Sequence, residues 1–82
     1  MPVVWTKPAQ RDVGSLSADV TQRVIAAVDR FAETGHGDVE RLKGEHPPTL
    51  RLRVGDYRVR FRIAGGEMLV LGVGHRRDVY RR

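Results

Sequence analysis

The sequence contains no cysteine, few aromatic residues and no long apolar run. Without cysteine the chain can form neither a disulfide nor a cysteine zinc site, and it has no thiol for catalysis. Because no apolar stretch approaches the ~18 residues of a membrane helix, we expect no contact with a membrane. The start of the chain, Met1 to Trp5, lacks the basic and long apolar regions of a signal peptide. These absences predict a cytoplasmic protein in a reducing compartment.

Recognisable metal and cofactor motifs are missing as well. The histidines His36, His46 and His75 are scattered, and the glycines form no phosphate-binding loop. No serine stands in a nucleophile-elbow pattern. We therefore expect no metal and no cofactor, and any catalysis has to rely on arginine.

Arginine is abundant, and 13 of the 15 basic residues are of this type. Residues 1–45 carry six basic and seven acidic side chains, whereas residues 46–82 carry nine arginines and three acids. With 82 residues we expect one domain, 1–82, in which one part carries the positive field. This asymmetry favours a polyanion or an acidic protein as the partner, the alternative being arginines that only keep the surface soluble.

The first half of the chain predicts one short strand and two helices. Residues 2–6 are typical of a strand and residues 6–14 of a short helix. Residues 18–34 repeat apolar side chains at helical spacing, between Ser17 as N-cap and Gly35 as C-cap. The apolar stripe of this helix consists of Val20, Val24, Ala27, Val28 and Phe31.

The second half predicts antiparallel strands after an irregular connection at residues 38–48. Apolar and polar residues alternate over 50–54 and 57–63, which indicates a hairpin with a two-residue turn. Residues 68–73 are apolar on both faces, so we expect a central strand there. Gly72 in this strand would let a helix approach closely.

The predicted hairpin carries arginines on the face away from its apolar side chains. Its register places Arg53 opposite Arg58 and Arg51 opposite Arg60, and Arg62 continues the row. Like charges that face each other in a sheet are destabilising, and we expect no acidic relief nearby. A bound phosphate backbone would offset this cost, whereas in the alternative the arginine stems cover apolar surface and their heads spread into water. We call these five residues the arginine ladder.

Residues 74–82 add a histidine, a tyrosine and four arginines. Tyrosine and arginine stack on exposed RNA bases, and histidine exchanges protons near neutral pH. RNA can be cut without a protein nucleophile, because its own 2′-OH can attack the adjacent phosphorus. Arginine would then stabilise the phosphoryl oxygens while a histidine or tyrosine moves a proton.

Residues 50–59, followed by residues 73–81, resemble the RelE family of the RelE/ParE toxin superfamily. Segments near the start and in the middle, 5–12 and 38–44, also look like that family. The resemblance implies an α+β fold in which a short N-terminal strand and three C-terminal strands form a mostly antiparallel sheet with two helices on one face. It also implies a toxin of a type II toxin–antitoxin system that enters the ribosomal A site and cuts mRNA by metal-free 2′-OH attack. A cognate antitoxin is then the expected protein partner.

The resemblance also implies roles for single residues. Arg58 matches a sheet arginine that stabilises the reacting phosphate, Arg76 an arginine at the phosphate or leaving group, and Tyr80 a tyrosine that contacts mRNA. Arg51 stands where relatives carry a lysine implicated as the base, and Arg is a poor base because it keeps its proton. His75 and Tyr80 are therefore candidates for the proton step. The candidate catalytic residues are Arg51, Arg58, His75, Arg76 and Tyr80, and the candidate RNA-binding residues are Arg53, Arg60, Arg62, Arg77 and Arg81.

Two other functions stay open at this point. The ParE branch of the superfamily is non-catalytic and inhibits DNA gyrase by binding it, and an inactive arginine-rich nucleic-acid-binding module is a further alternative. The set of Arg58, Arg76 and Tyr80 favours the nuclease, since ParE-like members generally lack it. Thr49 falls where relatives carry a second lysine. Because the chain ends two residues after Tyr80, we expect a C-terminal helix to be very short or absent.

Overall fold

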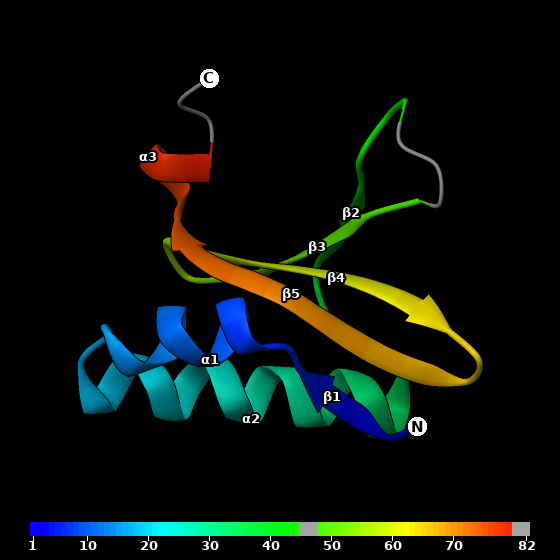
Figure 1. The fold of residues 1–82 in the computed structure, drawn as a ribbon, viewed down its shortest axis with the longest axis horizontal. Helices are drawn as coiled ribbons and strands as arrows, with labels where there is room; N and C mark the ends of the chain where they lie inside the picture. Colours follow the sequence, from blue (N-terminus) through cyan, green and yellow to red (C-terminus); the bar gives the residue numbers. More distant parts are fainter. Residues whose placement is uncertain (45–47, 80–82) are drawn as a thin grey trace.

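The computed structural model describes residues 1–44 and 48–79 and shows two helices packed on a five-stranded mixed sheet (Figure 1). The strand order is β1-β5-β4-β3-β2, with β1 parallel to β5 and every other pair antiparallel. The expected α+β fold is confirmed. Within the described residues no helix is long and apolar enough to cross a bilayer. In chain order the elements are β1 (Val3–Trp5), α1 (Lys7–Gly14), α2 (Ala18–Thr34), β2 (Val39–Arg41), β3 (Leu50–Val54), β4 (Tyr57–Ala64), β5 (Glu67–His75) and α3 (Arg76–Val79).

The two long helices begin and end where their capping residues predict. The Thr6 hydroxyl accepts a hydrogen bond from the Ala9 amide at the start of α1. The Ser17 side chain accepts one from the Val20 amide at the start of α2. Gly35 ends α2 with a φ of 74°, a left-handed conformation that favours glycine. The C-terminal helix was expected to be very short or absent, and α3 is short, spanning Arg76–Val79.

The core lies between α2 and the face of the sheet that α2 covers (Figure 1). Val24 and Val28 of the predicted stripe are fully buried, and the Phe31 ring packs on Phe61 with ring centroids 5.1 Å apart. Complete burial of each such side chain contributes on the order of 1.5–3 kcal/mol. The sheet supplies the remaining large core residues, Leu52, Val59, Phe61, Met68, Val70 and Val73. Because side chains alternate along β3 and β4, the residues between the core positions of these two strands face away from the helices.

The hairpin register is confirmed. β3 pairs with β4 so that Arg53 lies opposite Arg58 and Arg51 opposite Arg60, with the apolar pairs on the other face. β5 is central, as predicted, but extends further, to His75.

The connection at residues 38–48 was wrongly predicted to be irregular throughout, because it contains β2. This edge strand pairs antiparallel with β3, and Val39 lies opposite Leu52. Three residues are too few to show a period of two, and a strand this short forms only because β3 supplies its hydrogen-bond partners. Residues 45–47 of the connection lie outside the described part of the chain.

Helix α1 covers the edge of β5 that β1 leaves open. β1 pairs with residues 68–70, and at the end of this pairing the Thr6 hydroxyl donates to the Val70 carbonyl at 2.7 Å. Further along, the Asp12 carboxylate accepts the Val73 amide at 2.9 Å. The expected close approach of a helix to Gly72 is confirmed, since a Cβ at this glycine would lie 3.1 Å from Asp12 Oδ2.

Candidate functional site

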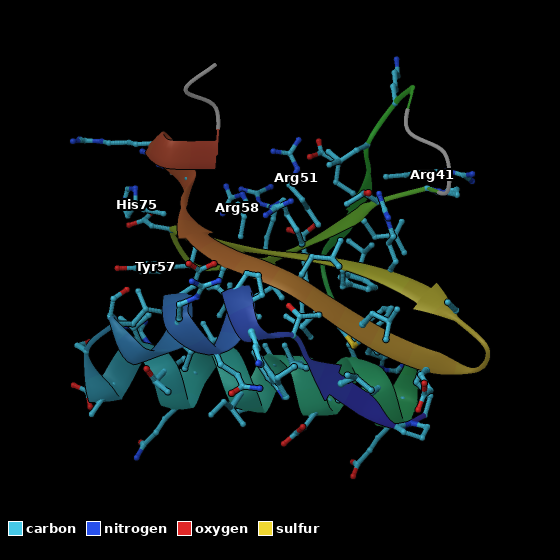
Figure 2. The ribbon with its side chains drawn as sticks, in the orientation of Figure 1. Arg41, Arg51, Tyr57, Arg58 and His75 are labelled. Carbon is cyan, nitrogen blue, oxygen red and sulfur yellow. The ribbon has the colours of Figure 1, made fainter. Side chains whose placement is uncertain are left out.

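The arginine ladder lies on the face of the sheet opposite the helices. Figure 2 shows Arg51 and Arg58 pointing away from α1 and α2. In Figure 1, α3 rises beside one end of this face and the β2 and β3 region beside the other. In the described part of the chain no helix layer lies over this face, which combines side chains from β3 and β4.

Two acidic side chains next to β3 partner its arginines, so the expectation of no acidic relief was wrong. Glu40 lies opposite Arg51 in the sheet, and its carboxylate is 3.1 Å from the guanidinium. Asp38 forms an ion pair with Arg53 at 3.5 Å, and its carbonyl accepts the Arg53 amide at 2.9 Å. The acids come from β2 and the residue before it, which the sequence pattern did not identify as sheet. They lower the cost of placing like charges side by side.

The arginines of β4 extend in other directions. The Arg58 side chain is buried, and its Nη1 donates to the carbonyls of Gly55 and Tyr57 at 3.0 and 2.9 Å. The Arg60 guanidinium lies over Gly72 of β5, with Nη2 2.8 Å from the point where a Cβ would stand. The β3 arginines thus reach toward acids at the sheet edge, whereas Arg58 reaches toward the turn and Arg60 toward β5. This divergence separates like charges whose Cα atoms lie opposite each other.

Arg62, at the other end of the ladder, is held by the residue that directly precedes β3. Its Nε donates to the hydroxyl of Thr49 at 3.2 Å, and Thr49 is itself buried. Thr49, which stands where relatives carry a second lysine, thus accepts a hydrogen bond from Arg62 of the ladder.

Three candidate catalytic residues converge on the β3–β4 turn, residues 55–57. Arg58 donates to two carbonyls of this segment, as described above. The Arg76 amide donates to the Asp56 carbonyl at 2.7 Å, and its Nε lies 3.8 Å from the Asp56 carboxylate. His75 pairs with Tyr57 across the sheet, and their rings meet edge to face with centroids 5.4 Å apart. One turn therefore fastens β4, the end of β5 and the start of α3 together.

His75 lies at the rim of the arginine face rather than on it. Strand alternation puts His75 on the side of Tyr57, and Figure 2 shows both side chains projecting past the end of the sheet. Its Nδ1 accepts the Arg77 amide at 3.2 Å. In a neutral ring this bond leaves the proton on Nε2, so His75 presents an N–H donor there.

The remaining candidates lie beyond this cluster. Arg76 and Arg77 are exposed at the start of α3. Tyr80 and Arg81, predicted as a catalytic and an RNA-binding residue, lie outside the described residues. Among the residues that the structure describes, no three His, Asp or Glu side chains are grouped so as to hold a metal ion.

Sequence reasoning missed the partners of the arginines: Asp38, Glu40, Asp56 and Tyr57. The spacing of Asp38 and Glu40 around Val39 is the alternation of a strand with an apolar inner and an acidic outer face. Three residues are too few for this alternation to predict a strand, and the strand becomes evident only from its pairing with β3.

The comparisons with known proteins agree with this fold. A family model described as the ParE toxin of the type II toxin–antitoxin system parDE matches residues 3–80. The chain therefore belongs to this toxin family, and the resemblance to the RelE/ParE superfamily is confirmed. Among curated protein sequences, none matches the chain.

Several solved structures with this fold come from toxin–antitoxin complexes. A chain of the RelB–RelE antitoxin–toxin complex of Methanococcus jannaschii aligns with a TM-score of 0.78 at 21% identity, covering 94% of each chain. A chain of the RelE–RelB complex of Pyrococcus horikoshii gives 0.76 at 23% identity, covering 92% of this chain and 93% of that one. A chain of the RelBE2 complex of Mycobacterium tuberculosis gives 0.59 at 28% identity, covering 90% and 95%.

Proposed function

We propose that this toxin is an endoribonuclease that acts in the cytoplasm and cuts mRNA in the A site of translating ribosomes. The observation that carries the proposal is the convergence of Arg58, His75 and Arg76 on the turn at 55–57, beside the arginine ladder. A reaction on a phosphate needs cations at fixed positions, and three separate elements meeting at one turn provide such positions.

The reaction is an internal transfer at phosphorus, without a metal ion. The 2′-oxygen of the RNA forms a bond to the adjacent phosphorus, and the bond from phosphorus to the 5′-oxygen of the next nucleotide breaks. The 2′-OH loses its proton, the 5′-oxygen gains one, and the products carry a 2′,3′-cyclic phosphate and a 5′-OH. The protein has to bind the extra negative charge on the phosphoryl oxygens and move the two protons.

The geometry suggests how the roles divide. Arg76 is exposed at the start of α3, so its guanidinium can reach a phosphoryl oxygen directly. Arg58 on β4 is buried next to the turn, where it contributes its charge while its hydrogen bonds hold the turn in place. To give a proton to the leaving 5′-oxygen, His75 has to be the imidazolium, in which Nδ1 also carries a proton and gives up its bond from the Arg77 amide, so that Nε2–H is the donor to the RNA. Arg51 adds charge on the face, and Tyr80 remains a candidate to contact the mRNA.

A cognate antitoxin is the expected protein partner. The similar chains from M. jannaschii and P. horikoshii were each solved as part of an antitoxin–toxin complex. An acidic or amphipathic antitoxin segment over the arginine ladder would keep this toxin inactive until the antitoxin is lost.

The test is mRNA cleavage in a reconstituted translation system, with and without ribosomes. We expect cuts by the wild type only on ribosome-bound mRNA, and a loss of cutting by more than about tenfold in Arg76→Ala, the effect of removing one charge-stabilising donor. Arg30→Ala is the matched control, because it removes an exposed arginine from α2 in the helix layer. Absence of cuts in every reaction would contradict the nuclease proposal.

A second candidate is inhibition of DNA gyrase by binding, the activity that the resemblance associates with the ParE branch. The match to the ParE family model favours it. A gyrase supercoiling assay distinguishes the two, because a gyrase inhibitor blocks supercoiling at concentrations that leave mRNA on ribosomes intact.

A further inference from the structure

The outer face of the sheet is organised in two parallel rows that run across its strands. In the first row Glu40 is followed by Arg51, Arg60 and Gly72 on successive strands from β2 to β5. In the second row the neighbours of Arg53 are Asp38 on one side and Arg58 on the other. Each row thus begins with an acid at the sheet edge and continues with two arginines.

The two acids resemble phosphates in what they do for the arginines. A carboxylate offers a guanidinium the same kind of oxygen acceptors as a phosphate does, so Glu40 and Asp38 occupy Arg51 and Arg53 as a nucleic-acid backbone would. A ladder arginine that already binds a carboxylate attracts a phosphate less strongly.

The burial of the first pair is strongly asymmetric. The Arg51 side chain is only 12% exposed, whereas that of Glu40 is 56% exposed. The arginine is therefore held by its surroundings, and the carboxylate is on the side of the solvent and can swing away. In the second pair both side chains are more than half exposed and the distance is longer, at 3.5 Å, so this pair is the weaker one.

We propose that Glu40, assisted by Asp38, sets the affinity of this face for RNA by competing with phosphate for the β3 arginines. In the resting toxin the acids pair with Arg51 and Arg53, and a single-stranded RNA backbone replaces them when it binds. The toxin then binds free RNA weakly and depends on the ribosome for additional contacts. This inference rests on the proposed function, because it assumes that the ladder face binds RNA.

The test is the binding of a short fluorescein-labelled single-stranded RNA, 2′-O-methylated so that it is not cut, measured by fluorescence anisotropy over a range of salt. For Glu40→Gln we expect an affinity higher by about two- to fivefold, the contribution of one exposed ion pair. The plot of log affinity against log salt should steepen by up to about 0.7, the value for one more phosphate contact on a single strand. Asp38→Asn should also raise the affinity and steepen the salt dependence, but by smaller amounts than Glu40→Gln.

Two controls separate this competition from a general charge effect. Glu33→Gln removes the same charge from an exposed position on α2 and should leave affinity and slope unchanged. In an Arg51→Gln background, Glu40→Gln should no longer raise the affinity, because the arginine for which the two anions compete is gone. An equal gain with or without Arg51, or no gain at all, would overturn the inference.

The outcomes also distinguish this inference from the proposed function. Binding of RNA by the wild type with unchanged affinity and slope in folded Glu40→Gln overturns only the competition. Absence of RNA binding in the wild type and in all variants also overturns the competition, whereas the proposed function fails only if mRNA on ribosomes is not cut. Circular dichroism shows whether Glu40→Gln is folded. If it is not, the RNA affinity and the salt slope of Asp38→Asn decide whether the competition exists.

Discussion

Two arginines that we propose to act on the same phosphate are held in opposite ways. Arg58 is 5% exposed, and its side chain donates to the carbonyls of Gly55 and Tyr57. The Arg76 side chain is exposed and forms one ion pair, with the Asp56 carboxylate at 3.8 Å. Loss of a buried hydrogen-bonding partner costs stability, whereas loss of an exposed side chain costs little.

This difference predicts that Arg58→Ala lowers the free energy of unfolding by about 1–3 kcal/mol. Arg76→Ala should change it by no more than about 0.5 kcal/mol, although both variants lose RNA cleavage. Urea denaturation followed by circular dichroism measures the two values. Equal stability of Arg58→Ala and the wild type would show that the turn does not depend on this side chain.

Tyr57 is a positioning residue for His75 in this structure. The rings meet edge to face, a contact that contributes about 0.5–1.5 kcal/mol beyond the burial of area. We expect Tyr57→Leu to reduce cleavage by up to about tenfold, the rate equivalent of that energy, and Tyr57→Phe to retain activity because it keeps the ring. A shift of the His75 ring protons in NMR spectra of the leucine variant, but not of the phenylalanine variant, separates positioning from a general loss of stability. Full activity in Tyr57→Leu would contradict this role.

At the scale of the elements, the strands of the hairpin could be predicted because their period of two extends over many residues. Together with the two-residue turn, this period determines which arginines face one another. β2 could not be predicted in this way, and neither could the ion pairs of Glu40 and Asp38, because they exist only through pairing with β3. The burial of Arg58 was also beyond sequence reasoning, since arginine is rarely buried unless its donors are satisfied. Its acceptors are backbone carbonyls, which leave no mark in the sequence.

The contact between β5, β4 and α1 gives a prediction at the same scale. A Cβ on Gly72 would lie 2.8 Å from Arg60 Nη2 and 3.1 Å from Asp12 Oδ2. The Arg60 guanidinium ends a flexible side chain and can move aside at little cost, so Gly72→Ala should act mainly by disturbing the Asp12 bond to the edge of β5 and lower stability by about 1 kcal/mol. Gly14→Ala is the matched control, because no atom beyond its chain neighbours and its own helix backbone lies within 4 Å of the added methyl group. Thermal unfolding measures both, and an unchanged melting temperature for Gly72→Ala would contradict the close packing described here.

At the scale of the whole molecule, the helices and the arginines divide the two faces of one sheet between them. The helix face provides the core, and the outer face accommodates its arginines through acids at one edge and glycine on β5. A chain of 82 residues has little apolar surface to bury, so the relief of like-charge repulsion on the outer face matters for folding as well as for binding. The surface that we propose to bind RNA is thus built by the same pairings that stabilise the sheet.

The most direct test of the proposed chemistry is to determine the new ends of mRNA cut by the toxin on programmed ribosomes. Attack by the 2′-OH predicts a 5′-OH on the downstream fragment and a 2′,3′-cyclic phosphate on the upstream one. A 5′-phosphate on the downstream fragment would mean that water was the nucleophile and would contradict the assigned roles of Arg76 and His75. Absence of toxin-dependent ends would contradict the nuclease proposal itself.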